Sequence, residues 1–149
     1  MFIIMVNFNP YIYKMVPITS KAEKIVDAIL YSNDKILLAS IRGWSGNILA
    51  VKYRDSFEER FSGISSLVGT NYSGSLTIAT LGLVDEVKHF FGEAQAIITI
   101  YEKCKVMLLP VPSYQIFVGL AVERSPDTEE KEESYNIANK IERLVADTL

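Results

Sequence analysis

The sequence predicts one α/β domain of the α+β type, built on a five-stranded antiparallel sheet with helices on both faces. Apolar residues recur at helical spacing in three segments, and shorter apolar runs between them have the length and residue types of strands. The links between neighbouring strands are short, which favours antiparallel pairing. The predicted order of elements is α-β-β-α-β-β-β-α, without a repeat or an internal linker.

Composition supports one domain and excludes several classes of function. The chain has 149 residues, of which 49% are apolar and 22% charged, so it can bury a core. Its net charge of −3 and its pI of about 5.2 lack the basic excess of a nucleic-acid-binding domain, and we expect no nucleic-acid partner. Cys104 and His89 are the single cysteine and histidine, which excludes an intrachain disulfide and a metal site built from several such ligands. We expect a cytoplasmic protein without a cofactor.

The N-terminal stretch MFIIMVNFNPYIYKMVPI is apolar but does not have the pattern of a targeting signal. It contains no basic residue before Lys14, and Pro10 and two asparagines interrupt the apolar run. The run is also shorter than the ~20 apolar residues that cross a bilayer, so no membrane span is expected. We interpret residues 1–18 as an arm that packs on the domain or as an upstream extension, and residues 19–149 as the domain.

The first element after this stretch is a predicted helix over Ser20–Ser32. Thr19 or Ser20 can cap its start, with Glu23 at the offset of a capping box. Apolar residues then recur at helical spacing, with lysines on the other side. Asn33-Asp34 end the helix, because their side chains compete for the hydrogen bonds of a turn.

Two strands, Lys35–Arg42 and Ile48–Arg54, are predicted to form an antiparallel hairpin around the turn Gly43–Asn47. This turn is not a phosphate-binding loop, because such a loop runs from a strand into a helix and ends in Lys-Ser/Thr. Trp44 in the turn has two interpretations. It folds back over the sheet, or it is an exposed anchor for a partner.

Basic residues near the hairpin are candidate contacts for an acidic partner. Arg42 and Arg54 end the two strands, with Lys52 close to the second end. The two arginines lie at opposite ends of the hairpin unless its register is short. The alternative interpretation is that these are ordinary charges of an edge strand, which protect a sheet from aggregation.

The segment Asp55–Gly92 is predicted to be a long helix interrupted by glycines, weakest at Gly69–Ser75. Its small residues suit a close approach to the sheet or to a twofold mate, with Ile78 and Leu81 as candidate contacts. Asp85 and His89 lie four residues apart in this segment. We interpret them as a surface pair of a helix, because a metal site needs three or more ligands.

Three further strands are predicted over Gln95–Tyr101, Lys105–Val111 and Tyr114–Glu123, followed by a helix over Thr128–Asp147. Pro110 has no amide hydrogen, so the second of these strands is expected to bulge or end there.

Two features of this C-terminal part have alternative interpretations. Cys104 lies between Lys103 and Lys105 in a predicted turn, where two ammonium groups would lower the pKa of an exposed thiol. It is therefore a reactive thiol or an ordinary turn residue. The run Asp127–Glu133 carries five acidic residues and one lysine. It is a solvated helix start or a docking site for a basic partner.

The hairpin ILLASIRGWSGNILAVKYR, the long central helix and the strand YQIFVGLAVE resemble roadblock/LC7 domains, within the wider profilin-like and longin-like group. The sequence is also similar to small archaeal proteins of uncharacterised function that share KI..A.I...G.ILA...R and V.LLP.P.....V.L. The resemblance spans about residues 20–149. It implies a homodimer joined through sheet edges and central helices, a protein partner such as a small Ras-like GTPase, and no catalytic residues.

We therefore predict a non-catalytic regulatory or scaffolding module that homodimerises and docks a partner. The alternative is a small-ligand sensor of PAS/GAF-like architecture. The sequence contains no readable nucleophile–base pair or metal set, so an enzyme is not expected. An exposed apolar surface around Trp44 and the central helix would favour the module, and a closed apolar cavity between sheet and helix would favour the sensor.

Overall fold

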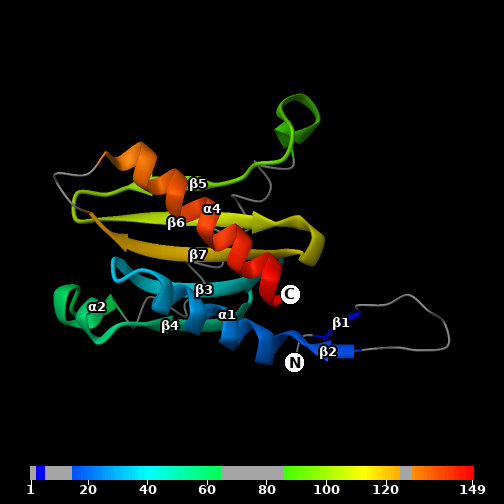
Figure 1. Cartoon of the computed structure of the whole chain (residues 1–149), viewed down its shortest axis with the longest axis horizontal. Coiled ribbons are helices and arrows are strands. Elements are labelled where there is room, and N and C mark those ends of the chain that lie inside the picture. Colours follow the sequence, from blue (N-terminus) through cyan, green and yellow to red (C-terminus); the bar gives the residue numbers. More distant parts are fainter. Residues whose placement is uncertain (1–2, 6–14, 65–85, 125–128) are drawn as a thin grey trace.

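A five-stranded antiparallel sheet forms the centre of the domain in the computed structural model, which describes residues 3–5, 15–64, 86–124 and 129–149. The strand order across the sheet is β4-β3-β7-β6-β5, with neighbouring strands antiparallel throughout (Figure 1). The predicted fold class is confirmed. The strands are β3 (Ile36–Gly43), β4 (Ile48–Tyr53), β5 (Ile97–Ile100), β6 (Cys104–Val111) and β7 (Ile116–Glu123).

Two long helices, α1 (Ile18–Ser32) and α4 (Glu130–Thr148), lie over one face of the sheet (Figure 1). Their apolar stripes bury the main core against that face. Ile25 of α1 and Ile141 of α4 are almost completely buried there. Burying an isoleucine fully contributes about 1.5–3 kcal/mol to the stability of the fold, so these two stripes hold the layers together.

A short helix, α2 (Asp55–Arg60), packs on the opposite face. Its Phe57 is buried against Leu37 of β3 and Ala121 of β7. Successive side chains of a strand point to opposite faces, and Leu120 next to Ala121 belongs to the core under α1 and α4. The helices therefore cover both faces, as predicted. Residues 86–91 are also helical and precede β5.

Several predicted boundaries differ from the structure by a few residues. Helix α1 starts at Ile18, two residues before the predicted start at Ser20. Strand β5 is shorter than predicted at both ends. Strand β7 begins at Ile116 because a 3₁₀ turn over Pro112–Tyr114 precedes it, with Gln115 in the left-handed conformation.

The expectation that β6 bulges or ends at Pro110 is wrong. The strand continues to Val111, and Pro110 lies opposite Phe117 of β7. The pairing of β6 with β5 stops at Leu108, and among the strands that the structure describes none replaces β5 beyond that point. The missing amide hydrogen of Pro110 is tolerated because one side of β6 is already at the edge of the sheet there.

The N-terminal stretch contributes a separate two-stranded sheet. β1 (Ile3–Met5) pairs antiparallel with β2 (Met15–Pro17), which runs directly into α1. Figure 1 shows these two strands beyond the N-terminal end of α1, apart from the main sheet. The division into an arm over residues 1–18 and a domain over residues 19–149 stays a prediction. No helix in the described ranges is both long and apolar enough to cross a membrane.

Candidate interaction surface

Arg54 fixes the C-terminal end of α1. Its Nε donates a hydrogen bond to the carbonyl oxygen of Ile36 at 2.7 Å. Its Nη2 donates to the carbonyl oxygens of Leu30 and, at 3.2 Å, of Asn33. The last carbonyls of a helix have no partner within the helix, and a cation near them is favoured by the helix dipole. Arg54 therefore has a structural role, and its guanidinium is committed to the backbone.

Arg42 is not a surface cation. Its side chain is only 6% exposed, and its Nη1 donates to the carbonyl oxygen of Gly46 in the β3–β4 turn at 3.1 Å. Burial lowers the pKa of the guanidinium from its ordinary value. Arg42 pairs with Ile48, whereas Arg54 follows the strand pair at its far end. Arg42 and Arg54 therefore do not form the candidate basic patch, because both side chains bind the backbone and, as expected, lie at opposite ends of the hairpin.

Trp44 folds back over the sheet, which is the first of its two interpretations. Its ring is tilted against Phe117 of β7, with the ring centroids 6.5 Å apart. Its backbone nitrogen donates to the carbonyl oxygen of Gln115 at 3.0 Å. The indole Nε1 is buried and has no hydrogen-bond partner among the residues that the structure describes. A contact of Trp44 with a partner stays a prediction.

The other candidates from the central segment are only partly visible. Ile78 and Leu81, the candidate contacts with a twofold mate, lie outside the described residues, as does Asp85. His89 is exposed on the helical residues 86–91. Within the described ranges no group of three or more His, Cys, Asp or Glu side chains is placed to hold a metal ion.

The lowered pKa that an exposed Cys104 thiol would have does not arise, because the thiol is not fully exposed. The thiol is half-buried, and burial raises its pKa, with a smaller opposing effect from Arg60. The ammonium group of Lys105 does not face the thiol, because neighbouring residues of a strand point to opposite faces. The Lys105 side chain lies under α4, and Cys104 faces the side that carries α2.

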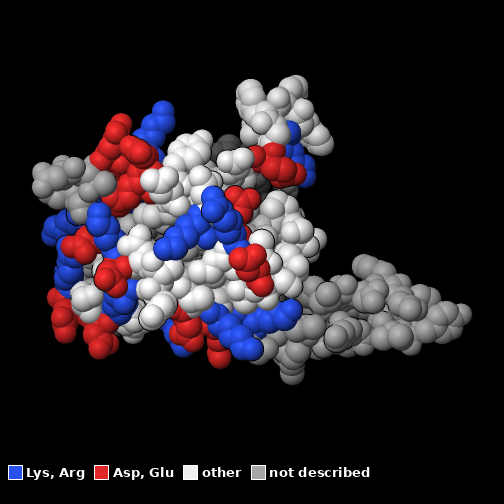
Figure 2. All heavy atoms as spheres, in the orientation of Figure 1, with Lys and Arg blue, Asp and Glu red and all other residues white. Residues whose placement is uncertain are grey.

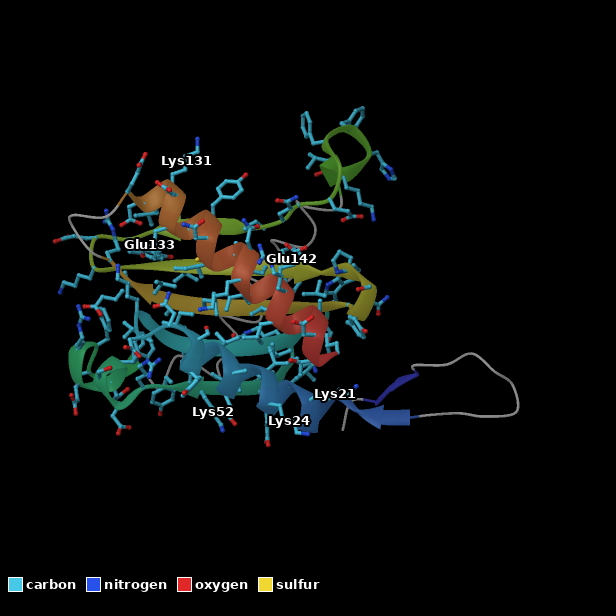
Figure 3. The ribbon with its side chains drawn as sticks, viewed as in Figure 1. Lys21, Lys24, Lys52, Lys131, Glu133 and Glu142 are labelled. Atoms are coloured by element: carbon cyan, nitrogen blue, oxygen red, sulfur yellow. The ribbon has the colours of Figure 1, made fainter. Side chains whose placement is uncertain are left out.

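A charge network centred on a buried lysine joins β6 to the start of α4, and sequence reasoning missed it. Lys105 is 1% exposed, and its Nζ lies 3.3 Å from Glu130 Oε2 and 3.2 Å from Glu133 Oε1. Arg124 Nε binds Glu130 at 2.8 Å, and Lys35 Nζ binds Glu133 at 3.1 Å. We call these five residues the Lys105 network. Lys131 on the same helix turn points away from the sheet (Figure 3).

The network changes how the acidic run is interpreted. The pKa of Glu130 is lowered, chiefly by a hydrogen bond from Arg124. Burial raises the pKa of Glu133, but the hydrogen bonds from Lys35 and Lys105 outweigh it and the net shift is downward. Two of the acids are thus anchors of α4 rather than parts of a solvated start. The sequence did contain a signal for this network. Lys105 is spaced by two residues from Met107, and Met107 by two from Leu109, which places the lysine on the buried face of β6.

The two edge strands of the sheet differ in chemistry. On β4, Lys52 is exposed and its Nζ lies 2.5 Å from Asp27 Oδ1 of α1, which is the kind of charge that protects an edge from further pairing. β5 has the sequence IITI and carries no charge. Ile98 is 38% exposed and Ile100 is 52% exposed. Among the described strands none covers the outer side of β5, so this apolar edge is open to another strand.

Aromatic side chains extend the apolar edge. Tyr101 follows β5 and Tyr135 lies on α4, and both are more than half exposed. Tyr135 and Ile98 line the same groove between α4 and β5, which has a volume of about 320 Å³. We call Ile98, Ile100, Tyr101 and Tyr135 the β5 strip. Exposed apolar side chains gathered at the edge of a sheet are typical of a protein–protein contact.

Two further grooves flank α4. One lies between the end of α1 and the first half of α4, with a volume of about 330 Å³. The other, of about 380 Å³, lies between the second half of α4 and the end of β6. All three are open grooves on the surface. They differ from the closed cavity between sheet and helix that a small-ligand sensor of PAS/GAF-like architecture would be expected to have.

Comparisons with solved structures identify the fold. The structure resembles a roadblock/LC7 domain from Streptomyces avermitilis with a TM-score of 0.55 at 10% identity, covering 84% of this chain and 92% of that one. It resembles MglB from Myxococcus xanthus with a TM-score of 0.52 at 10% identity, covering 88% and 92%. For the gliding protein MglB from Thermus thermophilus the TM-score is 0.53 at 12% identity, covering 91% and 95%. No protein-family model and no curated protein matches the sequence. At such low identity the likeness concerns the fold, and the chain has the fold of a roadblock/LC7 domain.

Proposed function

We propose that this chain is a non-catalytic regulatory or scaffolding module that homodimerises through β5 and docks a partner protein. The observation that carries the proposal is the uncharged edge strand β5, with Ile98 and Ile100 exposed beside Tyr135. Pairing of β5 with its counterpart in a second copy would satisfy the free backbone groups of both edges. It would also bring the two β5 strips together and remove them from water.

The expected partner is a small Ras-like GTPase. This choice follows the resemblance of the sequence to roadblock/LC7 domains and is supported by the fold. One solved structure with this fold is described as MglB with a tetrameric arrangement, and it matches with a TM-score of 0.53 at 12% identity. Self-association therefore occurs in a protein of the same fold, which makes it reasonable to test the assembly of this chain first.

The first experiment is the solution mass of the chain by multi-angle light scattering. We expect a dimer for the native chain and a monomer for the variant Ile98→Lys with Ile100→Lys, because a buried lysine pair would repel across the twofold axis. The matched control is Tyr31→Lys with Tyr53→Lys, which also places two cations on exposed apolar positions but away from β5. This control should remain a dimer.

A monomeric native chain would refute the dimer, and equal dissociation of both variants would refute the role of β5. The docking half is tested separately, by pull-down of small Ras-like GTPases loaded with GDP or with a non-hydrolysable GTP analogue. Failure to retain either form would remove the GTPase from the proposal.

A further inference from the structure

The groove between α1 and α4 is a preformed cleft with an apolar floor. Buried side chains of Ile36, Ile137 and Ile141 form this floor. Two bonds hold the walls together. Lys140 Nζ of α4 donates to the carbonyl oxygen of Ser32 at the end of α1 at 3.0 Å, and Lys35 beside β3 binds Glu133 at 3.1 Å. We call this cleft the α1–α4 groove. Its volume of about 330 Å³ accommodates one or two large side chains of another molecule.

The rim of the α1–α4 groove is negative. Glu129, Glu132 and Glu133 line it together with a single cation, Lys140. Glu133 is neutralised within the Lys105 network, and Lys140 is held by Ser32. Glu129 and Glu132 are exposed and form no ion pair with any residue in the described ranges. Figure 2 shows the acidic side chains gathered around the N-terminal end of α4.

The neighbouring helix end adds to this potential. Ser32 and Asn33, at the C-terminal end of α1, line the groove, and the C-terminal end of a helix carries partial negative charge. The dipole at the start of α4 explains why acids are placed there, since acids stabilise a helix N-terminus. It does not explain an apolar cleft beneath them. The combination of apolar floor and negative rim is complementary to a lysine or arginine, whose methylene stem buries while its charged tip remains at the rim.

We propose that the α1–α4 groove is the docking site for a basic, partly apolar segment of a partner protein. An apolar side chain of the segment lies over Ile137, and a neighbouring lysine or arginine binds Glu129 and Glu132. Arginine suits this pair because its guanidinium bonds two acceptors at once. This assignment rests on the docking half of the proposed function and is independent of the β5 contact, because the groove lies on the α1 side of α4 and the β5 strip on the other.

The test uses the whole chain and a labelled probe peptide of sequence LRLKLR, followed by fluorescence anisotropy at two salt concentrations. Saturable binding that weakens with salt is expected. Glu129→Gln with Glu132→Gln should raise the Kd at least about threefold, from the loss of two exposed ion pairs. The matched control is Glu142→Gln with Asp147→Asn, which makes the same charge change in the second half of α4 and should leave the Kd unchanged. Glu142 is labelled in Figure 3.

The outcomes separate the groove from the rest of the proposed function. No saturable binding, or an equal loss in both variants, would overturn the groove as the site. So would equal binding of a peptide in which glutamate replaces every basic residue. Light scattering on the same samples measures whether the chain is a dimer. A dimer that does not bind the peptide refutes only the docking role of the α1–α4 groove. A monomer that binds the peptide refutes only dimerisation through β5. Amide chemical shifts at Asn33 and Ile137 locate the bound peptide, and shifts confined to other regions would also contradict the assignment.

Discussion

Replacing Lys105 by methionine removes the centre of the Lys105 network while keeping the length of the side chain. Two charge-assisted bonds are lost, each of which contributes about 1.5–3 kcal/mol in a favourable setting. Each carboxylate still has one ion-pair partner in this variant, because Glu130 remains paired with Arg124 and Glu133 with Lys35. The cost should therefore lie below the roughly 3–5 kcal/mol of an unpaired buried charge, and we expect about 2 kcal/mol.

Urea denaturation followed by circular dichroism measures this loss as a lower midpoint with an unchanged slope. In a domain of this size the same loss lowers Tm by about 4–8 °C. The control is Lys131→Met on the exposed side of the same helix turn, which should change stability by less than ~0.5 kcal/mol. If Lys105→Met is as stable as Lys131→Met, the network does not anchor α4 and the reasoning is refuted.

The pH dependence of stability follows from the same contacts. The folded pKa values of Glu130 and Glu133 lie below their ordinary value of 4.5. Unfolding therefore raises these pKa values, and the stabilisation is fully present above about pH 4.5 and is lost as the pH falls through the folded values. Denaturation between pH 6 and pH 3 should show a shallower loss in Lys105→Met than in the native chain. A parallel loss in both would contradict the assignment of the shifts to Lys105.

Three further predictions concern single side chains. Arg54→Ala should lower the free energy of unfolding by about 2 kcal/mol and speed amide hydrogen exchange in the last turn of α1, because three backbone carbonyls lose their donor. Unchanged exchange in that turn would contradict the role of Arg54 at the end of α1. Cys104 should react with iodoacetamide at pH 8 more slowly than free cysteine, because burial raises the pKa of its thiol. Arg60→Gln should slow the reaction further, because the charge of Arg60 lowers that pKa. A rate equal to that of free cysteine would refute the effect of burial. Phe57→Ala should lower the free energy of unfolding in urea by about 3 kcal/mol, more than Phe61→Ala, because Phe57 of α2 is buried against the sheet and Phe61 is partly exposed. Equal losses for the two variants would show that α2 does not pack as described.

Local patterns in the sequence were sufficient to predict those helices and strands in which apolar residues recur at a regular spacing. The alternation in β6 and the helical spacing in α1 and α4 specify which side of each element is buried. The turn residues around Gly46 specify the β3–β4 hairpin, where Gly46 has a positive φ of 86°. These features depend on neighbours within a few residues along the chain, so they can be read without knowing the fold.

The roles of the charged residues could not be read in this way. Arg42 and Arg54 look like edge charges in the sequence, but each binds backbone carbonyls that the fold brings to it. Cys104 and Lys105 are adjacent in the chain and lie on opposite faces of the sheet. The electrostatic environment of a side chain depends on burial and on distant partners, and a pKa shift therefore cannot be assigned from sequence neighbours alone.

The sequence by itself determined the order of the elements, the antiparallel sheet and the single domain, because composition and periodicity are local properties. Only the tertiary structure decided that β5 is an edge strand among the described strands, that Lys105 is buried between Glu130 and Glu133, and that an apolar groove lies under Glu129 and Glu132. Each of these depends on segments far apart in the chain. Strand order and helix packing bring them together, and no local pattern specifies that contact.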